Sequence, residues 1–141
     1  MSQVSSTARE TARRLLQRET AGVTEEVALG AALERACTRA AGNLRRSVGD
    51  DGYSALLARA FAATPAERTL LNDLRRVDAA SIDLDVATGI RNHGVDAAGA
   101  AVEALIAAIV DILSDLIGVD MVQNLLDHDE PARRAGDRRT R

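Results

Sequence analysis

The chain contains no lysine and no tryptophan, and it has only one phenylalanine, one tyrosine and one cysteine. All 18 basic residues are therefore arginines, which we interpret as the codon usage of a GC-rich bacterial genome rather than as a selected guanidinium function. Aromatic residues make up 1% of the chain, too few for the stacking platforms that bind single-stranded nucleic acids. The core must therefore be built from leucine, isoleucine, valine and many alanines, each of which buries little area.

The single cysteine, Cys37, has no partner for an internal disulfide and lies within an apolar helical pattern. We interpret it as a small, inert core residue, which suits a reducing, cytoplasmic location. The start of the chain lacks the apolar segment of a signal peptide. The longest apolar run reaches the length of a membrane span, but Glu103, Asp111 and Asp115 fall on one stripe of its helical wheel. This polar stripe favours a helix inside a protein bundle and predicts no membrane partner.

Motifs for metal, phosphate or nucleophilic chemistry are absent from the sequence. Neither His93 nor His128 has a neighbour at metal-ligand spacing, and Cys37 stands alone. The glycines do not form a phosphate-binding loop between a strand and a helix. We therefore predict that the chain is not an enzyme and holds no metal and no cofactor.

Branched aliphatic residues recur every three or four positions from residue 96 onward, and Gly118 ends this run. The pattern predicts a long central apolar helix, a tight corner, and a shorter helix that packs back on the first. Four further amphipathic helices are predicted at residues 6–17, 25–47, 53–63 and 65–77. Together these elements predict an all-α, single-domain bundle of five or six helices, orthogonal or up–down, over residues 1–128.

Short sequence motifs predict where some of the helices begin and end. Thr64 is predicted to be an N-cap, with Pro65 in the first helical position and Glu67 completing a capping box. Residues 81–86 alternate as a strand would, but a lone strand has nothing to pair with. We therefore interpret residues 78–95 as an extended or partly helical connector, with room for one more short helix.

The C-terminal segment, residues 129–141, lacks a hydrophobic period and is predicted to be a disordered basic tail. Residues 131–141 carry a net charge of +4, whereas the preceding 130 residues carry −7. The tail is thus the segment whose charge suits a polyanion. The predicted contacts are Arg133, Arg134, Arg138, Arg139 and Arg141.

Two further surfaces are candidates for binding. Arg91, Asn92 and His93 are predicted to form a loop just before the central helix, whose free N–H groups attract anions. The central helix also has more apolar width than one face of a bundle needs, so part of it is expected to face a second copy of the chain. The residues expected at this interface are Val102, Ile106, Ile109, Val110, Leu113 and Ile117.

The sequence therefore predicts a small bacterial, adaptor-like module for protein interaction or regulation. It is expected to be cytoplasmic, non-catalytic and self-associating, with a homodimer as its simplest assembly. A second hypothesis is a nucleic-acid-associated regulator that uses the arginine-rich tail. A third is a helical bundle that binds a small ligand at the 91–93 loop.

Overall fold

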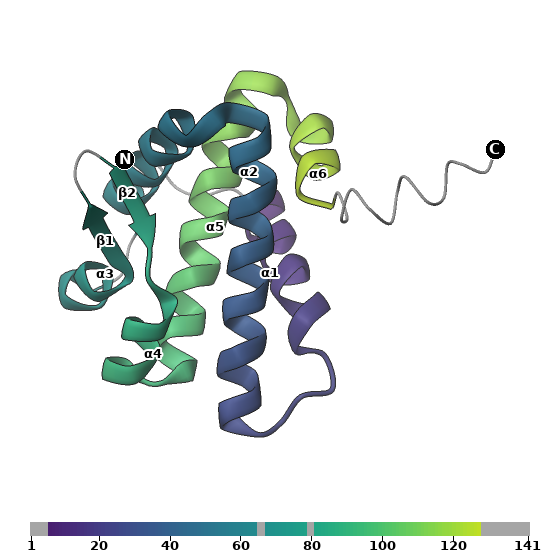
Figure 1. Ribbon diagram of the computed structural model, residues 1–141. Coiled ribbons are helices and arrows are strands. Elements are labelled where there is room, and N and C mark those ends of the chain that lie inside the picture. Colours follow the sequence, from purple (N-terminus) through teal and green to yellow (C-terminus); the bar gives the residue numbers. More distant parts are fainter. Residues whose placement is uncertain (1–5, 65–66, 79–80, 128–141) are drawn as a thin grey trace.

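The computed structural model describes residues 6–64, 67–78 and 81–127. Within them, six helices surround a common core and a short antiparallel hairpin covers one side (Figure 1). The elements are α1 (Ser6–Thr20), α2 (Glu26–Ala63), α3 (Arg68–Leu74), β1 (Arg75–Asp78), β2 (Ser81–Leu84), α4 (Val86–His93), α5 (Val95–Ile117) and α6 (Val119–Asp127). The predicted all-α bundle with a long central helix is confirmed. The predicted tail, with its five arginines and His128, lies outside the described residues.

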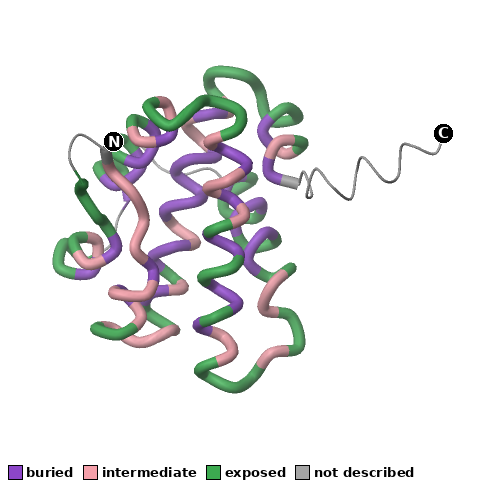
Figure 2. Tube along the Cα trace, viewed as in Figure 1, coloured by how far each residue is buried: buried purple, intermediate pink, exposed green. Residues whose placement is uncertain are grey.

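Helix α5 lies at the centre of the bundle, in contact with α1, α2, α4 and α6 (Figure 1). Its middle turns are buried on every side, because neighbouring helices cover them (Figure 2). Leu105 and Val102 are completely buried, and Ala107 also has no exposed area. Alanines at such positions let the surrounding helices approach α5 closely.

The central position of α5 overturns most of the predicted dimer interface. Five of its six residues are buried inside the chain itself, namely Val102, Ile106, Ile109, Val110 and Leu113. Ile117 alone among the six is exposed, at 43% of its area. The prediction was wrong for the other five because the extra apolar width of α5 is covered by helices of the same chain.

Glycines with positive φ form two of the sharp corners. Gly49, with φ of 81°, bends α2 near the middle of its length, where the sequence predicted a break between two helices. Gly118, with φ of 92°, ends α5 at the predicted position and starts the turn into α6. This region of backbone space strains any residue that carries a Cβ, so glycine suits both corners. Both corners lie at the same end of the bundle (Figure 1).

Within the connector expected at residues 78–95, the short helix α4 agrees with the prediction, whereas the extended part is a paired strand, β2. Strand β2 pairs with β1 in a register that runs from Arg75 opposite Leu84 to Asp78 opposite Ser81. The backbone N–H of Ile82 also donates to the Ser54 hydroxyl at 2.8 Å, which fastens β2 to the second half of α2. The predicted loop at residues 90–93 was wrong as well, since these residues form the last turn of α4.

The capping box predicted around Thr64 does not form. Thr64 instead closes α2, because its hydroxyl donates to the Ala60 carbonyl at 2.6 Å and its backbone N–H bonds to the carbonyl of Phe61. Glu67 is the N-cap residue of α3 and makes no capping bond with its side chain. The predicted role of Pro65 lies outside the described residues.

Candidate functional site

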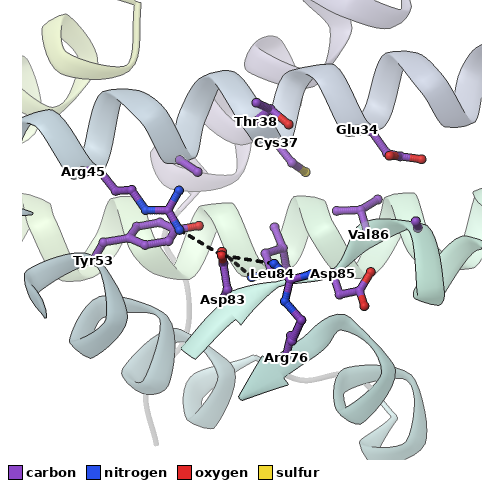
Figure 3. A pocket seen from close by; sticks show the side chains of 12 residues that line it. Glu34, Cys37, Thr38, Arg45, Tyr53, Arg76, Asp83, Leu84, Asp85 and Val86 are labelled. Carbon is purple, nitrogen blue, oxygen red and sulfur yellow. Dashed lines mark hydrogen bonds and ion pairs between the residues drawn. The ribbon is translucent and has the colours of Figure 1, made fainter. Parts of the chain in front are cut away.

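A polar pocket of about 350 Å³ lies between α2, the hairpin and the first turn of α4 (Figure 3). Its size is within the usual range of small-molecule sites. Leu84 and Val86 supply apolar surface beside the Cys37 side chain. The polar and charged residues that line it are Glu34, Thr38, Arg45, Tyr53, Arg76, Asp83 and Asp85.

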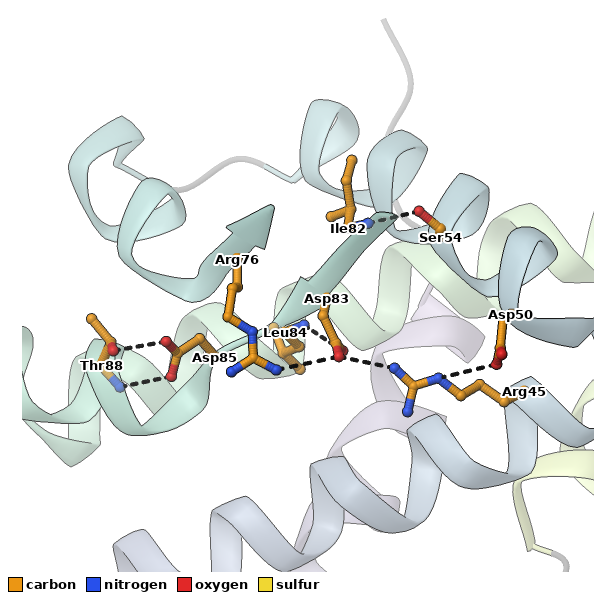
Figure 4. A network of polar contacts seen from close by, with 9 residues as sticks. All are labelled: Arg45, Asp50, Ser54, Arg76, Ile82, Asp83, Leu84, Asp85 and Thr88. Carbon is orange, nitrogen blue, oxygen red and sulfur yellow. Dashed lines mark hydrogen bonds and ion pairs between the residues drawn. The ribbon is translucent and has the colours of Figure 1, made fainter. Parts of the chain in front are cut away.

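Two arginines converge on one carboxylate in this pocket (Figure 4). Arg45 Nη2 donates to Asp83 Oδ2 at 2.9 Å, and Arg76 Nη2 lies 3.4 Å from the same oxygen. The other oxygen of Asp83 accepts the backbone N–H of Leu84 at 2.8 Å. Arg45 also meets Asp50 at 3.7 Å, but the Asp50 side chain is 91% exposed and its charge is screened by water. The cluster of two guanidinium groups and one carboxylate therefore carries an excess positive charge.

Tyr53 lies beside this cluster with its ring under the Arg45 guanidinium, whose central carbon is 4.5 Å from the ring centroid. The residue is only 3% exposed, and its hydroxyl points into the pocket (Figure 3). No hydrogen bond joins that hydroxyl to another of the described residues. Burial raises the pKa of Tyr53 to about 12, and the Asp83 charge adds to this effect while Arg45 opposes it. The phenol is therefore a protonated hydrogen-bond donor at neutral pH.

The opposite end of the pocket is acidic. Glu34 lies there, beyond Val86, whereas Asp85 lies between this end and Arg76 (Figure 3). Asp85 caps α4, since its two carboxylate oxygens accept the backbone N–H of Thr88 at 3.1 Å and the Thr88 hydroxyl at 2.8 Å. These hydrogen bonds outweigh the opposing effect of partial burial and lower the pKa of Asp85. The nearby Arg76 and Arg91 charges lower the pKa of Asp85 further, so Asp85 is charged at neutral pH.

Cys37 lies in the wall of the pocket and is buried, as predicted for a core residue. Burial raises the pKa of its thiol to about 12, and the nearby Glu34 charge raises it further. The thiol is therefore protonated at neutral pH, whereas nucleophilic attack and metal binding both require the thiolate.

The residues expected to hold an external anion hold a carboxylate of the same chain. Asn92 Nδ2 donates to Asp73 Oδ2 at 3.1 Å, and His93 Nε2 lies 2.7 Å from the same oxygen. Arg91 turns toward its own helix and donates to the Thr88 hydroxyl at 3.1 Å. The predicted binding loop is thus a clasp between α3 and α4, and we assign it a structural role.

We expect the contact of Asp73 with Asn92 and His93 to make the stability of the fold fall in acid. Hydrogen bonds from Asn92 and His93 lower the pKa of Asp73, so this carboxylate stabilises the fold above its unfolded pKa. That contribution is lost as the pH falls through the folded-state pKa, below about pH 4. We expect Asp73→Asn to be less stable than the wild type at about pH 5 and to approach it at about pH 3. Urea unfolding at both pH values measures this, and an equal difference at both would contradict it.

None of the charged residues that line the pocket was predicted from the sequence to bind a ligand. One signal was available, because pairing the alternating residues 81–84 with residues 75–78 places Arg76 opposite Asp83. Opposite charges facing each other across two strands are typical of sheets. Because residues 81–84 were predicted to have no pairing partner, this charge pair was not recognised.

A second surface lies at the turn between α5 and α6. Leu116, Ile117, Val119 and Met121, here called the corner patch, are between 42% and 67% exposed. A groove of about 350 Å³ adjoins them, lined by Ile117, Met121, Asn124 and Leu125 and, from α2, by Asn43, Arg46 and Ser47. The end of the bundle that carries this turn is largely exposed (Figure 2).

Comparison with known proteins gives no relative: no family model, no curated protein and no solved structure matches this chain. Over the described ranges, no three histidine, cysteine, aspartate or glutamate side chains gather as a metal site would require. None of the helices in that part of the chain is both long enough and apolar enough to cross a membrane.

Proposed function

We propose that this protein is a non-catalytic, adaptor-like interaction module that associates with a second copy of itself through the corner patch. The observation that carries the proposal is the grouping of exposed apolar side chains. Of the seven large hydrophobic residues that are exposed in the described part of the chain, four belong to the corner patch. Apolar residues gathered on a surface mark interaction sites, whereas isolated ones need no explanation.

A second copy is the occupant that the corner fits best. A two-fold interface uses the same surface on both copies, so that surface has to complement itself. The corner offers exposed side chains beside a groove that could receive them, with Arg46 on its edge. Asp115 and Asp120 are both exposed; Asp115 directly precedes the patch in the sequence, and Asp120 lies between Val119 and Met121. Two copies related by a two-fold axis can therefore bring Arg46 of one toward the carboxylates of the other.

The non-catalytic part of the proposal is supported by the state of the buried ionisable groups in the pocket. Cys37 and Tyr53 both have pKa values of about 12, so neither supplies a nucleophile or a base at neutral pH. A cytoplasmic, bacterial setting belongs to the same proposal. Its support is the single cysteine and the use of arginine for every basic residue.

The mass of the protein in solution tests the proposal. Wild-type protein at tens of micromolar is expected to show the dimer mass by light scattering, and Met121→Glu to show the monomer mass. Val77→Glu is the matched control, because Val77 is 62% exposed, close to the 59% of Met121, but lies on β1 away from the corner. This control is expected to remain dimeric.

A charge exchange tests whether the copies meet at the corner. Arg46→Glu and Asp120→Arg are each expected to weaken the dimer, and an equimolar mixture of the two variants to restore it in part. A monomeric wild type would reject self-association. A dimer that Met121→Glu leaves intact would reject the corner patch as its interface.

A further inference from the structure

Beyond self-association, we propose that the pocket between α2, the hairpin and α4 binds a zwitterion of the class formed by short peptides. The carboxylate of the ligand would lie at the end formed by Arg45, Arg76 and Tyr53. Its ammonium group would lie at the opposite end, beside Glu34.

At the carboxylate end, Arg45 and Arg76 have N–H donors that no described contact occupies. A guanidinium group carries five N–H donors. The contacts with Asp50 and Asp83 occupy two nitrogens of Arg45 and one of Arg76. Because Arg45 and Arg76 share the half-buried Asp83 carboxylate, a second carboxylate would balance the charge there. Arginine is well suited to bind it, since its planar donors match the geometry of a carboxylate.

The Tyr53 hydroxyl is the independent observation that points to a ligand. It is buried, points into the cavity, and has no hydrogen-bond partner among the described residues. A buried hydroxyl without a partner destabilises a fold, so such groups are nearly always hydrogen-bonded. Its partner must come from the pocket, and a phenol held in its protonated form donates to an anion.

The other end and the middle of the pocket suit the ammonium group and the apolar body of such a ligand. Glu34 is exposed at the rim and has no ion pair among the described residues, so its carboxylate is available to an ammonium group. Glu34 and Arg45 are eleven residues apart on α2, which is roughly 16 Å along a helix. Leu84 and Val86 line the space between these ends and suit a short apolar body. A purely anionic ligand would meet repulsion from Glu34 and Asp85.

Calorimetric titration of the full chain tests the ligand class. The probes are alanine, dialanine and trialanine, which are zwitterions of increasing length, together with N-acetyl-trialanine and trialanine amide. At least one zwitterion is expected to bind, and each capped form of trialanine to bind at least ten-fold more weakly than trialanine. Absence of binding by all three zwitterions, or equal binding by a capped form, would overturn the proposal.

Two substitutions test the site itself. Tyr53→Phe removes the unpartnered hydroxyl but keeps the ring under Arg45, so the melting temperature is expected to hold while binding weakens about ten-fold. Arg76→Gln is expected to weaken binding, whereas Arg75→Gln, one residue earlier on β1 and outside this pocket, is the matched control and is expected to leave it unchanged. Binding that is unaffected by both Tyr53→Phe and Arg76→Gln would overturn the proposal. None of these residues belongs to the corner patch, so this result is independent of the dimer experiment.

Discussion

Replacing Ile109 with alanine is expected to lower the free energy of unfolding by about 2–5 kcal/mol. Ile109 lies in the middle of α5 and is only 4% exposed. The substitution removes buried apolar area, and the helices packed around α5 can close the resulting cavity only in part. For a domain whose total stability is about 5–15 kcal/mol, this is a large loss.

Urea unfolding at one fixed protein concentration measures the effect of Ile109→Ala, since the proposed dimer would also add to the apparent stability. Val27→Ala is the control, because Val27 is 78% exposed on the first turn of α2. The control is expected to change stability by less than about 0.5 kcal/mol. If Ile109→Ala lowered the free energy of unfolding as little as the control does, α5 would not be at the centre of the fold.

Gly89→Ala is expected to lower stability by about 1–3 kcal/mol through overpacking. A Cβ placed on Gly89 would lie 2.5 Å from Cδ2 of Leu74, which is too close for two carbon atoms. Leu74 is fully buried where α3 packs against α4, so it has little room to move away. The absence of a side chain at residue 89 is therefore what allows these two helices to meet.

Two companion variants isolate the contact at Gly89. Gly99→Ala is the matched control, because Gly99 is also helical but its added Cβ would lie 3.9 Å from the Leu33 side chain. The free energy of unfolding of Gly99→Ala is expected to rise by about 0.5–1 kcal/mol, because alanine has a higher helix propensity than glycine. In a Leu74→Ala background the cost of Gly89→Ala is expected to disappear, since the clashing atom is gone. An equal cost in both backgrounds would contradict the packing explanation.

The helices with the strongest periodicity could be predicted from sequence, and the contacts between elements could not. The end of α5 at Gly118 was correct because 22 residues of uninterrupted helical period left a single break. Thr64 was misassigned because a threonine hydroxyl can cap the following helix or bond back to the preceding one, and only the structure shows which. Strand β1 was missed because Val77 extends the helical spacing of Leu70 and Leu74.

The pocket could not be predicted for a different reason. Glu34, Tyr53, Arg76 and Asp83 come from separate segments of the chain and form no motif in the sequence. They meet because α2 bends at Gly49 and because β2 is fastened to its second half. The prediction of the dimer interface on α5 was wrong for a related reason. The apolar width of a helix does not reveal how many helices of the same chain surround it.

The scarcity of aromatic residues gives the protein a built-in optical reporter. With no tryptophan and a single tyrosine, its tyrosine emission arises from one ring, that of Tyr53. That ring lies under a cation and in the wall of the pocket, so its emission is sensitive to the position of Arg45. Occupation of the pocket and separation of the hairpin from α2 can thus be followed in the unlabelled wild-type chain, at one position known in advance.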